Sequence, residues 1–346
     1  MKIFRNFLLL IILASISLSH ARAQNENNFE ISKNLEIFIS LYNELNKSYV
    51  DNINPGELMV SGIESMLGTL DPYTVYIPES EIEDYRMITT GQYGGIGALI
   101  HKSGPYVVIS EPYEGFPAQK TGLRAGDRII SINGEDMYDK PSDEVSKFLK
   151  GQPGTTVSIS IERDRVDETL DFEVKRENIT IPDIPYYGML NEHIGYIKLT
   201  GFTQQAGNKV KEAFTELKSN HDLQGVILDL RSNGGGLLGE AVNVTNIFVD
   251  KGQLVVSTKG KLKDKNQDHY TRFNAIDTKI PLAVMVDAHS ASASEIVAGA
   301  IQDMDRGVVI GQRSFGKGLV QNVVPLSYNS QMKVTVAKYY IPSGRC

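Results

Sequence analysis

The sequence predicts a mixed α/β (α+β) protein in which a helical segment and a β-rich module precede an α/β core. First, apolar residues recur at helical spacing over residues 30–48 and 57–68. Second, short β-patterned runs separated by Gly-rich turns fill residues 91–176. Third, from residue 193 onward continuous apolar runs alternate with amphipathic helical patterns, which indicates buried strands joined by helices.

The first 23 residues have the pattern of a secretory signal peptide. A basic start, "MKIFRN", is followed by the apolar run "FLLLIILASISL" and the small-x-small site "ARA". The apolar run is shorter than the roughly 20 residues that span a bilayer. We therefore expect cleavage near Ala23/Gln24 and export to the periplasm or cell envelope, with an uncleaved membrane anchor as the alternative. No cysteine follows the apolar run, which argues against a lipoprotein anchor.

Composition excludes several classes of protein. The net charge of −7 and the absence of basic stripes argue against a nucleic-acid partner. The single cysteine, Cys346, excludes a disulfide scaffold and a cysteine metal cluster. The six histidines show no ligand spacing, so we expect no metal.

Turn signals separate the first two parts of the chain. "DNINPG" divides the two helical patterns, and "LDPYTVYIP" ends the second at Pro72. The β-rich module contains the runs "IGALI", "YVVISEP", "RIISING" and "TVSISIER", and one helix is expected near residues 142–149.

Two loops of the core stand out. Buried strands at 225–230 and 281–287 lead into the loops 231–236, "RSNGGG", and 288–294, "AHSASAS", each of which precedes a helix. Chemistry in open α/β sheets gathers at the carboxyl ends of strands, and helix N-termini offer unpaired N–H groups. We expect this sheet to be covered on both faces, and residues 260–276 to be an exposed connection.

Ser292 has two interpretations from the residues alone. "SASE" fits a helix capping box, yet a serine between a buried strand and a helix could also be a nucleophile, although "HSASA" is not the G-x-S-x-G elbow. A nucleophilic serine needs a base. His289 lies only three residues away, with no evident partner acid. Lys317, between two glycines, is either a solvated turn residue or a base.

A lysine that acts as a base must be neutral. In water its pKa is near 10.4, so a lysine base needs a pKa lowered by roughly three units through burial or positive charge. Phe315, the flanking glycines and apolar neighbouring strands could bury the Lys317 amine. The residues alone leave both interpretations open.

Several motifs, in order, resemble one family. They are "GIESMLGTLDPYTVYI", "GGIGALI", "GLRAGDRIISING", "ILDLRSNGGGLL", "SASASEIVAGAIQD", "SFGKGLVQ" and "AKYYIPSGR". Together they are similar to the C-terminal processing peptidases, or tail-specific proteases, which are S41 serine proteases with a PDZ domain and a crotonase-like core. The resemblance implies domains at 24–90 (N-terminal helical segment), 91–176 (PDZ) and 177–346 (protease core). Because the family usually continues beyond "YYIPSGR", it also implies that the C-terminal part is truncated.

The resemblance implies catalysis by a Ser/Lys dyad, a mechanism that needs no cofactor. It assigns Ser292 as the nucleophile, Lys317 as the base, and Gln321 as the residue that completes the catalytic site. Backbone N–H groups should form the oxyanion hole: that of Ala293, and one from the glycine run, for which we favour Gly235.

Substrate choice would belong to the PDZ module. Such domains add a peptide as an extra strand and bind its carboxylate through backbone N–H groups. Here "GGIG" would supply Gly95, Ile96 and Gly97, and apolar protein tails are the expected partners. A PDZ fold that acts only as a spacer is the alternative. Lys150 could sense the bound state, and an adaptor or a homo-oligomer is compatible with the family.

The leading prediction is therefore an exported serine endopeptidase. One alternative is a non-catalytic periplasmic PDZ protein that holds C-termini, although no dyad residue is missing here. Another is a thioester-acting enzyme on a crotonase-like core, which the Gly-rich loop fits but the FGKG lysine and the PDZ motifs do not.

Overall fold

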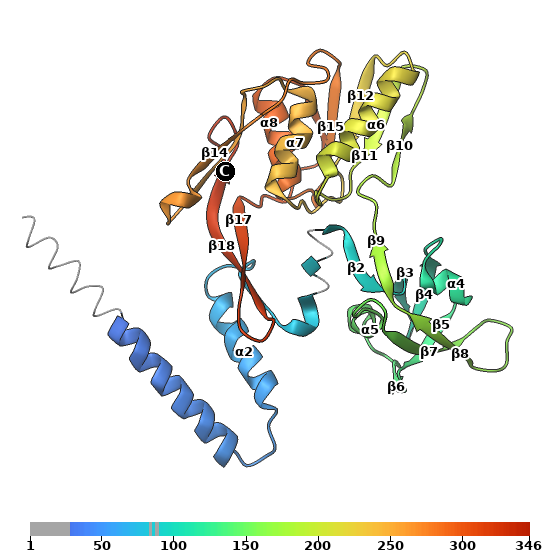
Figure 1. Cartoon of the computed structure of the whole chain (residues 1–346), viewed down its shortest axis with the longest axis vertical. Helices are drawn as coiled ribbons and strands as arrows, with labels where there is room; N and C mark the ends of the chain where they lie inside the picture. Colours follow the sequence, from blue (N-terminus) through green and yellow to red (C-terminus); the bar gives the residue numbers. More distant parts are fainter. Residues whose placement is uncertain (1–27, 83–84, 87–89) are drawn as a thin grey trace, which may run out of the picture. The chain divides into compact units, whose positions relative to one another are not determined.

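The structure, a computed structural model, describes residues 28–82, 85–86 and 90–346, and Figure 1 traces them. The chain divides into one unit that ends at Thr69 and a second that runs from Leu70 to Cys346. The predicted signal peptide, residues 1–23, lies outside the described residues. Within the ranges described, no helix is long and apolar enough to cross a membrane.

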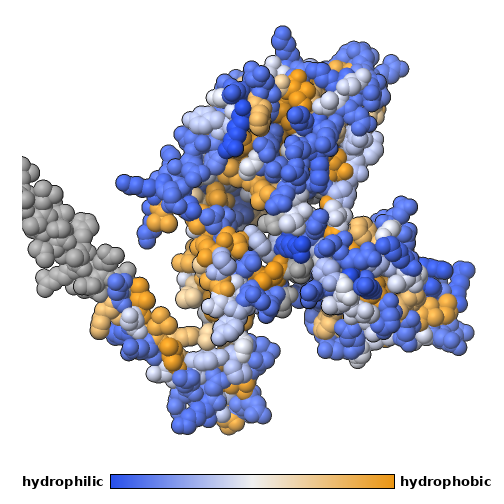
Figure 2. Space-filling model, viewed as in Figure 1, coloured by the Kyte–Doolittle hydropathy of each residue, from blue (hydrophilic) through white to orange (hydrophobic). Residues whose placement is uncertain are grey.

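The first unit contains two helices. Residues 28–48 are helical, and α2 spans Pro55–Gly68. Asn54 caps α2, because its side-chain oxygen accepts the N–H groups of Gly56 and Glu57 at 3.0 and 3.4 Å. Both predicted helices and the turn between them are confirmed. The helix of residues 28–48 carries exposed apolar side chains, which Figure 2 shows in orange.

A β-rich module occupies the first half of the second unit. Its larger sheet has the order β3-β4-β5-β7-β8, with β6 paired to β5, so β3 is an edge strand. A separate pair joins β2 to β9. The predicted helix at 142–149 is confirmed as α5, and the short helix α4 is an addition to the prediction. The elements are β2 (Gln92–Gly95), β3 (Ala98–Ser103), β4 (Tyr106–Pro112), α4 (Pro117–Thr121), β5 (Arg128–Ile132), β6 (Glu135–Asp136), α5 (Ser142–Leu149), β7 (Thr156–Glu162), β8 (Leu170–Lys175) and β9 (Glu177–Thr180).

The core is built on a five-stranded sheet of order β10-β11-β12-β15-β16. Strand β10 is antiparallel to β11, and the other pairs are parallel. The strands are β10 (Tyr186–Met189), β11 (Ile194–Lys198), β12 (Gly225–Asp229), β15 (Leu282–Val286) and β16 (Val308–Gly311). The helices that follow β11, β12 and β15 are α6 (Ala206–Asn220), α7 (Leu238–Phe248) and α8 (Ala293–Asp303).

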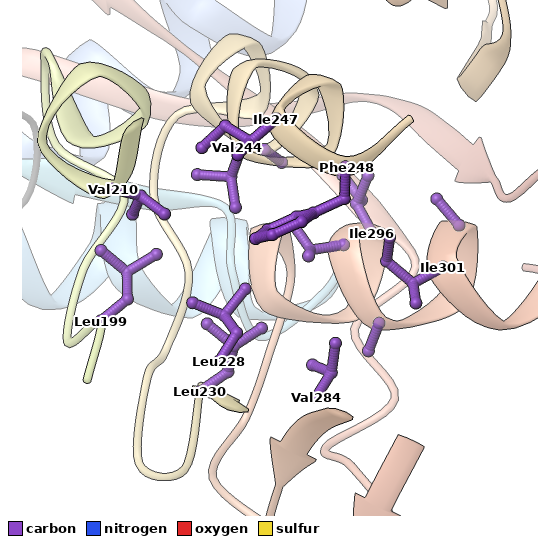
Figure 3. Close-up of a cluster of buried hydrophobic side chains, with 14 of the residues drawn as sticks. Leu199, Val210, Leu228, Leu230, Val244, Ile247, Phe248, Val284, Ile296 and Ile301 are labelled. Atoms are coloured by element: carbon purple, nitrogen blue, oxygen red, sulfur yellow. The ribbon is translucent and has the colours of Figure 1, made fainter. Parts of the chain in front are cut away.

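The hydrophobic core lies between one face of this sheet and the three helices. Leu228 and Val284 point from neighbouring strands toward Phe248 of α7 and Ile296 of α8 (Figure 3). On the other face, Tyr196, Ile227 and Met285 are only half-buried. The expectation of a sheet covered on both faces is therefore wrong for the described residues, because an apolar strand does not reveal which of its faces receives the helices.

A second, antiparallel sheet completes the core. Its order is β1-β18-β13-β14, and β17 pairs with β18. The strands are β1 (Val75–Ile77), β13 (Leu254–Gly260), β14 (Gln267–Tyr270), β17 (Leu319–Pro325) and β18 (Gln331–Tyr340), with short 3₁₀ turns η1 (Glu79–Glu81) and η2 (Lys263–Lys265). The expectation that residues 260–276 are only a connection is wrong, because they contain β14. The mixed α/β fold class is confirmed, and the loops after β12 and β15 and the loop before β17 position the site.

Candidate active site

Ser292 stands at the junction of the β15–α8 loop and α8. It occupies the N-cap position with φ 57° and ψ −112°, a sparsely populated backbone conformation for a residue with a side chain. The loop is fixed around it: the Asp287 carboxylate accepts the N–H of Ser232 at 2.9 Å and that of His289 at 2.9 Å. These bonds hold the pKa of Asp287 down at about 2. The neighbouring loops thus keep the Ser292 turn in its strained shape.

The glycine loop after β12 lies directly against this turn. Gly235 has φ +99°, and a Cβ there would stand 2.8 Å from the Ser292 Cβ and 2.9 Å from the Ala293 nitrogen. Asn233, fully buried, joins the two loops, because its carbonyl accepts the Ala291 N–H at 3.0 Å. The sequence prediction that these loops meet is confirmed.

The backbone donors around Ser292 differ in their availability. The Ala293 N–H begins α8 and has no acceptor among the described residues. The N–H of Gly235 donates to Asn233 Oδ1 at 2.9 Å. Those of Gly234 and Gly236 have no acceptor in the described part of the chain. The Gly235 N–H could donate to an oxyanion only if its hydrogen bond to Asn233 Oδ1 were shared or broken.

Glu295 connects the serine turn to the lysine loop. One carboxylate oxygen accepts the N–H of Ser292 at 2.8 Å and that of Lys317 at 2.9 Å. The other accepts the Gly316 N–H at 2.6 Å and the Ser314 hydroxyl at 2.8 Å. The predicted capping box is thus present through its glutamate, which also holds a segment some twenty residues away.

Lys317 has a fixed backbone and a half-buried side chain. Its Nζ lies 4.8 Å from the ring centroid of Tyr73. Burial first, and then the charge of Lys333, lower the pKa of Lys317, while Glu295 and Asp71 act in the opposite direction. The Phe315 side chain is 56% exposed and does not cover the amine. Of the two interpretations left open by the residues, the half-buried one holds, and the aromatic ring beside the amine is that of Tyr73.

Gln321 lies on β17, opposite Thr335 of β18. Its side-chain amide donates to the Thr335 hydroxyl at 3.5 Å. The strand begins at Leu319, after Lys317, so alternation along a strand does not decide whether the two side chains share a face.

A cavity of about 640 Å³ brings these residues together. Ser292, Lys317 and Gln321 line it, together with Gly234, Gly235 and Gly236. No hydrogen bond joins the Ser292 hydroxyl to the Lys317 amine within the described residues. His289 is exposed and does not line the cavity, so it does not pair with Ser292 as a base here.

The predicted carboxylate loop connects β2 to the edge strand β3. Gly97 has φ +73°, and a Cβ there would meet the Phe116 side chain at 2.5 Å. The N–H groups of Ile96 and Gly97 have no acceptor among the described residues, while Gly95 belongs to β2. Lys150, at the end of α5, has its Nζ 5.5 Å from the Tyr93 ring centroid.

Two features of the site were missed by sequence reasoning. Glu295 was visible only as part of a capping box, and Lys333 gave no signal because its position depends on the pairing of β17 with β18.

No group of three or more His, Cys, Asp or Glu residues in the described ranges is arranged to hold a metal ion.

Comparisons with known proteins agree with this architecture. Residues 193–346 match the model of peptidase family S41, and residues 108–163 match that of the PDZ domain. A carboxy-terminal-processing protease of Bartonella bacilliformis is 34% identical over 323 residues, which cover 92% of this chain and 73% of the relative. A probable CtpA-like serine protease of Staphylococcus epidermidis is 32% identical over 96% of this chain and 67% of its own length. The solved photosystem II D1 C-terminal processing protease aligns with a TM-score of 0.51 at 30% identity, covering 89% of this chain and 88% of that one.

Proposed function

Because this chain belongs to the carboxy-terminal-processing serine proteases of peptidase family S41, we propose that Ser292 is its nucleophile and Lys317 its general base. The resemblance predicted from the motifs is confirmed at the level of the family, and the chain is a serine endopeptidase of that family. The proposal extends this to the residues, the mechanism and the location. The enzyme is exported, and it recognises the free C-terminus of protein substrates through its PDZ domain.

The reaction is acyl transfer in two steps. The neutral Lys317 amine takes the proton of the Ser292 hydroxyl as its oxygen attacks the scissile carbonyl. The resulting ammonium returns the proton to the leaving amine, which departs and leaves an ester on Ser292. Water then attacks this ester, again giving its proton to Lys317, and the new C-terminus is released with the serine restored. No cofactor takes part in these steps.

The observation that carries this proposal is the shared cavity. Ser292 comes from the loop after β15, Lys317 from the loop before β17, and the glycine run from the loop after β12, yet all line one space. The single carboxylate of Glu295 binds the backbone N–H of both Ser292 and Lys317. Such a constraint fixes the backbones of the two loops relative to each other before substrate arrives.

The oxyanion would be stabilised at the start of α8. The Ala293 N–H follows the nucleophile and is free to donate, which supports its predicted role. We propose that the glycine run supplies the second N–H. Gly235, the predicted donor, would have to share Asn233 Oδ1, whereas the N–H groups of Gly234 and Gly236 have no acceptor among the residues that the structure describes. Gln321 would orient the amine from β17.

The PDZ module would bind the substrate tail. Strand β3 is an edge strand next to α5, and a peptide added beside it would place its carboxylate at the loop before β3. The N–H groups of Ile96 and Gly97, which have no acceptor in the described ranges, are the proposed carboxylate donors, together with that of Gly95. Apolar tails fit this site, because Leu99 of β3 exposes half of its side chain. An adaptor or a homo-oligomer stays a prediction.

Export and the domain limits remain predictions from the sequence. We propose that residues 1–23 are removed near Ala23/Gln24 and that the mature protein works in the periplasm or cell envelope. We also keep 24–90, 91–176 and 177–346 as the domains.

The test is cleavage of an unstructured protein with an apolar C-terminal tail by the mature enzyme. Ser292→Ala and Lys317→Ala should each abolish cleavage, while the controls Ser219→Ala and Lys338→Ala, at exposed positions, should not. Tail binding by inactive Ser292→Ala should persist. Cleavage by Ser292→Ala would disprove the nucleophile. Tail binding without cleavage by the wild type would favour the alternative of a non-catalytic PDZ protein.

A further inference from the structure

A second lysine lines the catalytic cavity. Lys333 belongs to β18 and is half-buried. It lines the same cavity as Ser292 and Lys317. The register between β17 and β18 is continuous from the pair Gln321–Thr335 to the pair Val323–Lys333. Lys333 therefore projects from the same face as Thr335, whose hydroxyl accepts the Gln321 amide.

Within residues 28–82, 85–86 and 90–346, Lys333 has no countercharge. No carboxylate in the described part of the chain lies within ion-pair distance of its amine, whereas Lys198 and Lys209 of the same core each pair with an aspartate. Because Lys333 is half-buried, water hydrates its ammonium only in part, and this burial lowers its pKa. A half-buried cation without a partner costs stability, so its position suggests a role in the reaction.

Two carboxylates, those of Glu295 and Asp71, also act on the Lys317 amine, and the Tyr73 ring lies beside it. Glu295 is on α8, and its two oxygens accept three backbone N–H groups and the Ser314 hydroxyl. Tyr339 of β18 also donates its hydroxyl to Glu295, at 3.3 Å. Asp71 accepts the N–H groups of Tyr73 and Thr74, each at 2.8 Å, and neither carboxylate forms an ion pair with the Lys317 amine. The two carboxylates raise the pKa of Lys317, and the positive charge of Lys333 lowers it.

We propose that Lys333 is a positioning residue of the catalytic centre: its unpaired ammonium keeps Lys317 in the neutral form that accepts the Ser292 proton. This inference rests on the proposed function, since it assumes that Lys317 is the base. The physical principle is that a cation beside an amine disfavours the protonated amine. Burial lowers the pKa of both amines, and the charge of Lys333 lowers that of Lys317 further.

The test is the pH dependence of kcat/KM for cleavage of the apolar-tailed substrate. Lys333→Met removes the charge and keeps an unbranched chain. Without the neighbouring cation the pKa of Lys317 rises, so the acidic limb of the profile should move to higher pH by about one unit. At a pH on that limb, kcat/KM should fall by about tenfold and recover as the pH is raised.

Two matched variants separate charge from packing. Lys333→Arg retains the positive charge and should keep the wild-type limb. Lys338→Met, at an exposed position of the same strand, should leave the profile unchanged. Should Lys333→Met fold poorly, Lys333→Gln replaces it as the neutral variant, with folding checked by the thermal midpoint.

Three results would overturn the inference. An acidic limb that stays in place in the neutral variants, with kcat lowered at every pH, would mean a structural role. A rise in KM alone would mean that Lys333 contacts the substrate. A shift of the limb that also appears in Lys333→Arg would exclude charge as the cause. The parallel Lys317→Ala assay separates the two proposals, because activity in that variant overturns the proposed function itself.

Discussion

The turn that carries Ser292 and the loop that carries Lys317 meet at one carboxylate, but their side chains are constrained differently. Ser292 has a strained backbone fixed by contacts from two neighbouring loops, and its side chain is short. Lys317 has a fixed backbone N–H, whereas the end of its long side chain is placed by a contact of 4.8 Å between Nζ and the Tyr73 ring centroid. The proposed nucleophile is therefore positioned by backbone geometry, and the proposed base depends on the electrostatics of the cavity.

Among changes outside the Ser292/Lys317 pair itself, Glu295→Ala should have the largest effect, because it removes the group that both halves share. The Ser292 and Lys317 N–H groups would lose their common acceptor. Since misplacement of a reacting group by 1 Å can cost about 100-fold, loss of both constraints should lower kcat/KM on the order of a thousandfold. Steady-state kinetics measures this, with Glu240→Ala on α7 as a control outside this contact network. Near wild-type activity in a folded Glu295→Ala enzyme would refute the shared constraint.

Gly235→Ala tests the serine half of the comparison. The new Cβ would stand 2.7 Å from the Ala291 carbonyl oxygen and 2.8 Å from the Ser292 Cβ, at a φ of +99°. The turn must shift, so we expect kcat to fall by about 100-fold. The matched control is Gly239→Ala on α7, because a Cβ there would meet nothing within 4 Å and the residue does not line the cavity. Equal activity of the two variants would show that the packing of the glycine loop on the turn is unimportant.

The sequence was most informative where one segment determined its own structure. The runs "GVILDL" and "PLAVMVD" became β12 and β15, and the cap before α8 placed Ser292 at a helix start. In a continuous apolar run, the residues on both faces of the strand are apolar. The sequence therefore could not predict which face of the sheet packs against the helices. Strand β14 has the polar sequence "QDHY" and lies at a sheet edge. Because it lacks the apolar pattern of a buried strand, the sequence predicted a connection there.

The candidate site shows the same limit. Ser292, Lys317 and Gln321 were predicted from motifs, and the structure places all three on one cavity. Glu295 and Lys333 act across the fold, and their partners are set by loop packing and strand register rather than by spacing in the sequence. A charge that works through space leaves no local pattern for sequence reasoning to detect.

Asp287→Asn tests how firmly the serine turn is anchored. The Asp287 carboxylate has a pKa of about 2, mainly because it accepts the Ser232 N–H. A depressed pKa stabilises the folded state above the unfolded value near 3.8, and this contribution is lost as the pH falls toward 2. We expect a thermal midpoint a few degrees below wild type at pH 7, with the gap closing between about pH 4 and 2. The exposed Asp167→Asn should show no such gap, and a gap that does not depend on pH would contradict this account.

Tyr73→Leu tests the lysine half, with the smallest expected effect. The Tyr73 ring face attracts the Lys317 ammonium more than the neutral amine, so removal of the ring should lower the pKa of Lys317. A cation–π contact of about 0.7 kcal/mol corresponds to roughly half a pH unit, and the acidic limb of kcat/KM should move down by that amount. Tyr73→Phe keeps the ring and should keep the limb in place.

The shift expected for Tyr73→Leu is opposite in sign to that expected for Lys333→Met, so the double variant should have an acidic limb closer to wild type than either single variant. If both single variants moved the limb in the same direction, loss of packing rather than charge would control the base, and the contrast between the two halves of the site would fail.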